Sequence, residues 1–236
     1  MSVQLCILET DDLHPALVNP FVSYGQMFAQ LFSDQPISAT AEVFNVCRGE
    51  YPSSTQRFDA YLITGSKADA FSDEPWIARL RDFAHERFHA GDKLLGICFG
   101  HQLLAHSLGG HAGRSEKGWG LGVQHYALHS RPSWMQPELP RLQLQASHQD
   151  QVHQLPEGAQ LLASSDFCAH AAFHIGDQLL CFQGHPEFPD GYAKALLDIR
   201  RERLGDDLHA SASVSLEQAH HGRIVGEWML RFVRGY

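Results

Sequence analysis

The 236-residue sequence predicts an α/β fold with a mainly parallel central sheet, flanking helices and a small antiparallel extension. In the first half, continuous apolar runs of strand length alternate with segments of helical periodicity, which is typical of a parallel sheet covered on both faces. In the middle, short strand-like runs follow one another between turn residues, which is typical of antiparallel pairing. No repeat or linker divides the chain, so we expect a single domain over residues 1–236.

The first half opens with a strand, a helix and a strand, and then repeats this alternation. Apolar runs predict the strands, and apolar residues at helical spacing predict the helices. An early proline marks the start of the second helix, and two glycines mark the end of the third. In order, these elements are Val3–Glu9, Ser23–Phe32, Glu42–Val46, Ala60–Thr64, Glu74–Ala90, Lys93–Cys98 and Phe99–Leu108.

The second half begins with the antiparallel region, between Gly118 and Leu180. Its five strand-like runs read GVQHYAL, RLQLQAS, QLLASS, AAFHI and QLLCFQ. Two helices are expected after them, with a loop between the two. These segments are Gly191–Arg203, Asp206–Ser215 (the loop) and Ser215–Val233.

Composition excludes several classes of function. The 27 acidic against 18 basic residues give a net charge of -9, which repels nucleic acids and anionic membranes and leaves small molecules or other proteins as partners. The N-terminal apolar run is too short for a signal or membrane segment, so we expect a cytoplasmic protein. Five cysteines without a C-x-x-C pair, and sixteen histidines without an H-E-x-x-H motif, predict neither a disulfide framework nor a metal site.

Cys98 stands between a strand and a helix in the run Gly96-Ile-Cys-Phe-Gly100. The flanking glycines permit a tight turn that leaves the central side chain exposed above the sheet edge, as in a nucleophile elbow. Unpaired N–H groups at the helix start favour a thiolate, and the Phe99 amide points to where an oxyanion would form. On these five residues alone, a buried structural cysteine is the alternative.

The segment QGHPEF offers a base and its anchor. In an extended segment, residues two apart project to the same side, so His185 can face Cys98 while Glu187 stays beside it. Pro186 stiffens the pair. The alternative is an ordinary exposed turn before a helix.

Two further segments supply candidate residues. Gly65 lacks a Cβ, so its N–H can approach a substrate oxygen closely, although a routine turn explains this glycine almost as well. In QASHQDQV, polar side chains from Ser147 to Asp150 crowd at a strand end, where a simple polar turn is the alternative.

Together these segments resemble the class I glutamine amidotransferases, the glutaminases with a Cys-His-Glu triad. GICFGHQLL resembles the family's nucleophile motif, GHPE its His/Glu motif, and SHQDQVHQLP a segment of GMP-synthase-type glutaminase domains. The resemblance implies the flavodoxin-like class I glutaminase fold. It also implies that Cys98 is the nucleophile, His185 the base and Glu187 its orienting carboxylate, with the amides of Gly65 and Phe99 as the oxyanion hole.

The same resemblance implies that Gln102, Ser147 and His148 contact the amino-acid part of the substrate. One departure concerns the loop that reads Gly-Pro-Gly or Gly-Gly-Pro in many members. Here it reads Thr64-Gly-Ser-Lys67, and we expect Lys67 to alter the pocket.

The implied reaction is hydrolysis of the γ-amide of glutamine or of a γ-glutamyl compound through a γ-glutamyl thioester, without metal or cofactor. No synthase domain is fused to the motifs, which leaves a glutaminase that serves a separate synthase subunit, or a hydrolase of γ-glutamyl peptides. A non-catalytic regulatory protein is a third hypothesis, against which the complete triad speaks. An α/β-hydrolase would carry its acid before the histidine, whereas here the acid follows it.

Overall fold

The computed structural model describes residues 2–189 and 191–236, and it has the predicted α/β architecture. Its main sheet has the strand order β2-β1-β3-β4-β11-β10-β9-β6-β7. The strands from β2 to β11 in that order are parallel, and the remaining pairs are antiparallel. The strands are β1 (Val3–Glu9), β2 (Ala39–Asn45), β3 (Ala60–Ile63), β4 (Leu94–Ile97), β6 (Gly120–Leu128), β7 (Leu142–His148), β9 (Gln160–Ser164), β10 (Ala172–Ile175) and β11 (Leu179–Phe182). A separate antiparallel pair consists of β5 (His111–Arg114) and β8 (Asp150–Gln154).

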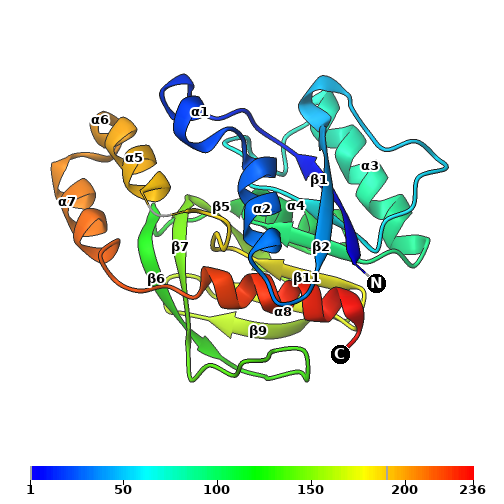
Figure 1. Cartoon of the computed structure of the whole chain (residues 1–236). Coiled ribbons are helices and arrows are strands. Elements are labelled where there is room, and N and C mark those ends of the chain that lie inside the picture. Colours follow the sequence, from blue (N-terminus) through cyan, green and yellow to red (C-terminus); the bar gives the residue numbers. More distant parts are fainter. Residues whose placement is uncertain (1, 190) are drawn as a thin grey trace.

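Helices cover both faces of the sheet (Figure 1). One hydrophobic cluster joins β1 to α2 and α8, and a second joins it to α3 and α4. Successive residues of β1 alternate between the two clusters, with Leu5 and Ile7 in the first and Cys6 and Leu8 in the second. The helices are α1 (Pro15–Phe21), α2 (Tyr24–Ser33), α3 (Pro75–His89), α4 (Phe99–Ser107), α5 (Tyr192–Ile199), α6 (Arg201–Leu204), α7 (Asp206–Ser215) and α8 (Gly222–Arg234), and η1 (Val46–Arg48) is a 3-10 turn.

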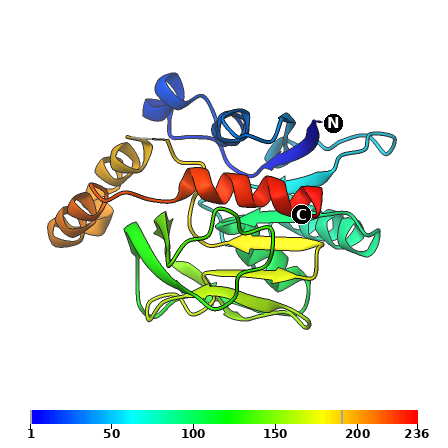
Figure 2. The same ribbon diagram turned by 60° about the horizontal axis from the view of Figure 1, so that its bottom comes forward.

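The C-terminal third differs from the sequence prediction. The expected loop Asp206–Ser215 is helix α7, which starts with two aspartates whose charge suits a helix N-terminus. The expected helix Gly191–Arg203 is interrupted between α5 and α6 at Arg200. The last helix begins at Gly222 rather than at Ser215, because the Ser215 hydroxyl bonds both backbone groups of Val123 in β6 and α7 ends there. Figures 1 and 2 show α5, α6 and α7 together at one end of the molecule, beyond β6 and β7.

Two general properties follow from the described residues. Among them, no helix combines the length and the apolar character needed to cross a bilayer. All five cysteines are free thiols; four are buried, and Cys47 is exposed in η1.

Helix α4 packs very closely against β3 and β4. A Cβ on Gly100 would lie 2.2 Å from the carbonyl oxygen of Ile63, and one on Gly96 would lie 2.7 Å from the carbonyl oxygen of Gly100. Both obstacles are backbone atoms, which cannot rotate away. The two glycines of the elbow are therefore required by the packing of the helix on the sheet.

We expect Gly100→Ala to lower the free energy of unfolding by about 1–3 kcal/mol or more, because the added methyl group overpacks a backbone contact. Gly113→Ala is the matched control, since a Cβ there would meet atoms at ordinary distances of 3.4 Å and beyond. Urea unfolding of both variants checks this expectation. Equal stability of the two variants would contradict the close approach of α4 to β3.

Candidate active site

Parallel pairing of β4 with β11 brings the two predicted catalytic segments together. Ile97 lies opposite Phe182, and the amide of Cys98 donates a hydrogen bond to the Phe182 carbonyl at 2.9 Å. The chain leaves both strands at their carboxyl ends, which lie at the same edge of the sheet. Cys98 and His185 therefore emerge side by side although they are far apart in the sequence.

Cys98 occupies the turn between β4 and α4 in a strained backbone conformation. Its φ of 53° lies in the left-handed region, which a non-glycine residue rarely adopts, and its side chain is 5% exposed. The turn is fixed on the far side by a hydrogen bond from the Gly100 amide to the Thr64 carbonyl at 3.1 Å. This backbone conformation places the thiol at the start of α4 and next to the end of β3.

His185 is held on several sides at once. Its Nδ1 lies 2.7 Å from Oε1 of Glu187, and both side chains are almost completely buried. The Cys98 side chain is near enough to the His185 ring to raise its pKa. Its amide donates to the Gln145 carbonyl at 2.8 Å, and the Phe188 ring stacks on the imidazole at a centroid distance of 3.9 Å. The only sign of this stacking in the sequence is an aromatic residue directly after the GHPE motif.

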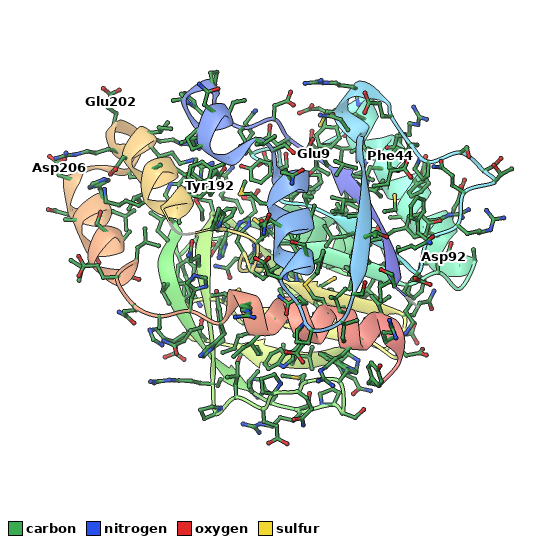
Figure 3. The ribbon with its side chains drawn as sticks, in the orientation of Figure 1. Glu9, Phe44, Asp92, Tyr192, Glu202 and Asp206 are labelled. Atoms are coloured by element: carbon green, nitrogen blue, oxygen red, sulfur yellow. The ribbon has the colours of Figure 1, made fainter. Side chains whose placement is uncertain are left out.

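Phe188 in turn rests on further aromatic residues. Its ring packs on Tyr192 at 4.6 Å, and the Tyr192 hydroxyl donates to that of Tyr24 at 3.0 Å. Figure 3 shows Tyr192 at the end of α5 that faces the body of the molecule. The support of His185 therefore extends to α2 and α5.

Burial and the neighbouring side chains have opposite effects on the pKa of His185. Burial alone lowers its pKa, but the Glu187 carboxylate and the Cys98 side chain outweigh burial and raise the pKa from 6.5 to about 10. The acceptor at Nδ1 assigns the Nδ1 proton to the bond with Glu187 and leaves Nε2 to face other groups. This arrangement suits a histidine that exchanges a proton with a neighbouring thiol.

Gly65 lies against both residues of the pair. A Cβ at this position would be 2.8 Å from Cε1 of His185 and 3.6 Å from Cβ of Cys98. The Gly65 carbonyl accepts a hydrogen bond from the Thr10 hydroxyl at 2.9 Å. In the described part of the chain, neither the Gly65 nor the Phe99 amide has a hydrogen-bond acceptor, so both donors are available to an oxygen atom beside Cys98.

A small pocket of about 70 Å³ opens at Cys98, and the three predicted substrate-binding residues line it. The Gln102 amide group is tied to the Asp150 carbonyl at 2.8 Å and to Gln183 at 3.1 Å. Nδ1 of His148 donates to the same carbonyl, and burial lowers the pKa of His148 to about 4, so its ring is neutral at neutral pH. Ser147 accepts a hydrogen bond from Arg200 at 2.7 Å.

The pocket also contains residues that no sequence motif marks. They are Asp69, Arg114, Trp119, Arg200 and Arg203. Arginines on a predicted helix are typical of a solvated face. In the structure, Arg200 and Arg203 at the junction of α5 and α6 line the pocket. Lys67, expected to alter the pocket, lines it and forms an ion pair with Asp11 at 2.6 Å.

Comparison with protein families assigns the chain. The family described as Glutamine amidotransferase class-I matches residues 58–197, more than half of the sequence. The chain belongs to the class I glutamine amidotransferase family. This amidotransferase chain is 31% identical to gamma-glutamyl peptidase 3 of Arabidopsis thaliana over 223 residues, which cover 90% of the chain and 89% of the relative.

Two further similarities complete the comparison of this amidotransferase. One subunit of the glutamine-hydrolyzing GMP synthase of Methanocaldococcus jannaschii is 34% identical over 127 residues, 51% of this chain and 64% of that protein. The crystal structure of a glutamine amidotransferase from Thermotoga maritima has a TM-score of 0.77 at 19% identity and covers 99% of this chain and 97% of its own. The structural match shows that the two chains share one fold over 99% of this chain.

We expect Glu187→Gln to lower the pKa of His185, because the carboxylate that counters the burial of the ring is lost. In the wild type, the raised pKa contributes stability that is fully present below about pH 6.5 and is lost as the pH rises through about 10. Urea unfolding midpoints across this window should therefore fall less steeply in Glu187→Gln. The exposed variant Glu202→Gln should keep the wild-type profile; an unchanged profile in Glu187→Gln would refute the electrostatic role of Glu187.

Proposed function

We propose that this protein is a cysteine-dependent hydrolase of γ-glutamyl peptides, which releases glutamate and an amino acid or peptide. The observation that carries the proposal is the juxtaposition of Cys98 with the buried His185–Glu187 pair, in a chain that matches a γ-glutamyl peptidase along nine-tenths of its length. The match to the GMP synthase subunit covers only half of the chain. The peptidase hypothesis therefore has more support than the hypothesis of an ammonia-supplying subunit.

In the first step, the Cys98 sulfur attacks the γ-carbonyl carbon of the substrate, and His185 holds the thiol proton. The carbonyl oxygen becomes an oxyanion, for which the amides of Gly65 and Phe99 are the proposed donors. The C–N bond then breaks, and the imidazolium transfers its proton to the leaving nitrogen. The products of this step are a free amine and a γ-glutamyl thioester on Cys98.

In the second step, a water molecule attacks the thioester carbon and gives a proton to His185. The C–S bond breaks, glutamate leaves, and the imidazolium again stands beside a thiolate. Glu187 takes no proton in either step; it fixes the orientation of the ring and stabilises its positive charge. Gln102, Ser147 and His148 are the proposed contacts of the glutamyl half, and the reaction requires no metal or cofactor.

A second candidate function is a glutaminase that transfers ammonia to a separate synthase subunit. The similarity to one subunit of a GMP synthase favours it. The chemistry at Cys98 would be the same, with ammonia in place of an amine. The two candidates differ in whether the isolated chain is active and in which leaving group it prefers.

We expect the purified protein to hydrolyse a γ-glutamyl dipeptide without any partner, with a kcat/KM at least about tenfold above that for glutamine, because uniform contacts to a larger leaving group add transition-state binding. Coupled detection of glutamate measures both reactions. A preference for glutamine, or activity that appears only with an added synthase, would favour the second candidate and refute the peptidase hypothesis.

Replacement of the nucleophile provides an independent test. We expect Cys98→Ser to lower kcat by roughly 10³-fold or more, since a hydroxyl cannot replace the thiolate in a triad that acts as a unit. The exposed Cys47→Ser is the matched control and should keep wild-type activity. Substantial activity in Cys98→Ser would support a non-catalytic role for Cys98 and refute the proposed mechanism.

A further inference from the structure

The pocket at Cys98 is bordered on one side by two arginines and a tryptophan. Arg200 and Arg203 come from the junction of α5 and α6, and Trp119 precedes β6. The guanidinium carbons of Arg200 and Arg203 lie 5.6 and 5.1 Å from the centroid of the Trp119 ring. Arg200 also donates a hydrogen bond to the Ser147 hydroxyl at 2.7 Å. Both guanidinium groups therefore make cation–π contacts with the same Trp119 ring in the lining of the pocket.

These two charges differ from the other cations around the pocket. Lys67 is paired with Asp11 at 2.6 Å, and Arg114 with Asp150 at 2.8 Å. Within residues 2–189 and 191–236, no carboxylate lies within 4 Å of the Arg200 or Arg203 guanidinium.

Two acidic residues of α6 and α7 point away from the patch. Figure 3 shows Glu202 and Asp206 on its outer margin, away from the body of the molecule. Arg201, the neighbour of both pocket arginines, forms an ion pair with Asp206 at 2.8 Å. The two pocket arginines thus form a positive patch in a protein whose net charge is -9. An anion bound to both guanidinium groups would relieve the repulsion of two like charges and gain charge-assisted hydrogen-bond donors from each.

The positive patch is built on a packed support. Leu121 of β6, Leu197 of α5 and Ala212 of α7 form a small hydrophobic cluster, and Trp119 packs against it. The bonds between Ser215 and Val123 fix the end of α7 to β6. A patch held in this way does not have to be ordered when a ligand binds, which favours affinity.

The position of the patch relative to the family match indicates which part of a substrate it serves. Glutamine and a γ-glutamyl peptide share the glutamyl half and differ only beyond the scissile bond. The residues proposed to contact the glutamyl half, Gln102, Ser147 and His148, lie within the matched residues 58–197, as does Trp119, whereas Arg200 and Arg203 lie beyond them. The two charges of the patch therefore come from outside the segment that the family model matches, which favours a role at the part of the substrate in which peptides differ from glutamine.

We infer that Arg200 and Arg203, stacked on Trp119, bind the carboxylate of the leaving group, so that the substrates are γ-glutamyl peptides with a free C-terminal carboxylate. This inference rests on the proposed function, because it assigns the leaving-group side of the same site. The arginines act in substrate binding and leave the chemistry to Cys98 and His185.

The test combines two substrates with three variants of the full-length protein. γ-Glutamylglycine carries the carboxylate, and its C-terminal amide, γ-glutamylglycinamide, lacks it. We expect Arg203→Gln to lower kcat/KM for γ-glutamylglycine about tenfold or more, through loss of a charge-assisted hydrogen bond, and to leave the amide within about twofold of the wild type. Arg200→Gln also removes the bond to Ser147, so its loss on γ-glutamylglycine should exceed its loss on the amide by about tenfold or more. Arg201→Gln is the matched control and should change neither substrate.

The contrary outcomes are distinct from one another. Equal losses on both substrates would mean that the arginines bind the α-carboxylate of the glutamyl half or only support the fold, and either result overturns the inference. Unchanged kinetics on γ-glutamylglycine overturn it as well.

Failure of the proposed function is recognised separately, as absence of hydrolysis of either substrate and of glutamine by the wild type. Calorimetric titration of Cys98→Ser then still tests the inference. The inference requires γ-glutamylglycine to bind about tenfold or more tightly than its amide, and the difference to disappear when Arg203→Gln is added. Equal binding of the two compounds would overturn it.

Discussion

The hydrogen bonds between β4 and β11 connect two segments that are distant in the sequence, and the candidate active site depends on this pairing. The elbow after β4 presents Cys98, and the extended segment after β11 presents His185 at the same edge of the sheet. β3 completes the arrangement, because Gly65, two residues beyond the end of this strand at Ile63, lies against the imidazole. Three adjacent parallel strands thus supply the nucleophile, the base and an amide donor of the proposed reaction. A slip of β11 by one residue would turn the His185 side chain to the other face of the sheet.

Close packing at this edge explains why the chemistry-bearing residues are surrounded by small ones. Gly65, Gly96 and Gly100 each stand where a Cβ would meet the imidazole or the backbone at less than 3 Å. The same closeness forces Cys98 into a strained conformation, which persists because the flanking strand and helix determine it. The strain lowers stability at the site, and the two hydrophobic clusters on either side of the sheet offset that loss.

The parallel half of the fold and the triad are visible in local signals of the sequence, and the rest depends on tertiary contacts. Continuous apolar runs identify β1, β3, β4 and β11 because both faces of these strands are buried, and the spacing around Cys98 and His185 is characteristic of the family. The segment of β5 reads HAGR and has no alternation, and α7 escapes prediction because its apolar residues are few and only Ala212 is buried. The pocket arginines carry no local signal at all, since the bend at Arg200 that turns them inward follows from the packing of α5 and α7 on β6.

The contacts around His185 limit how far its ring can move during the proposed reaction. One face of the imidazole is covered by the phenyl ring, Gly65 lies against Cε1, and Glu187 holds Nδ1. These contacts hold the ring in one orientation. Nε2 must therefore exchange a proton first with the Cys98 sulfur and then with the leaving amine. The substrate must then move instead: its leaving nitrogen has to come within reach of the fixed His185 imidazolium. Such a site would favour substrates whose single bonds on either side of the planar scissile amide rotate freely.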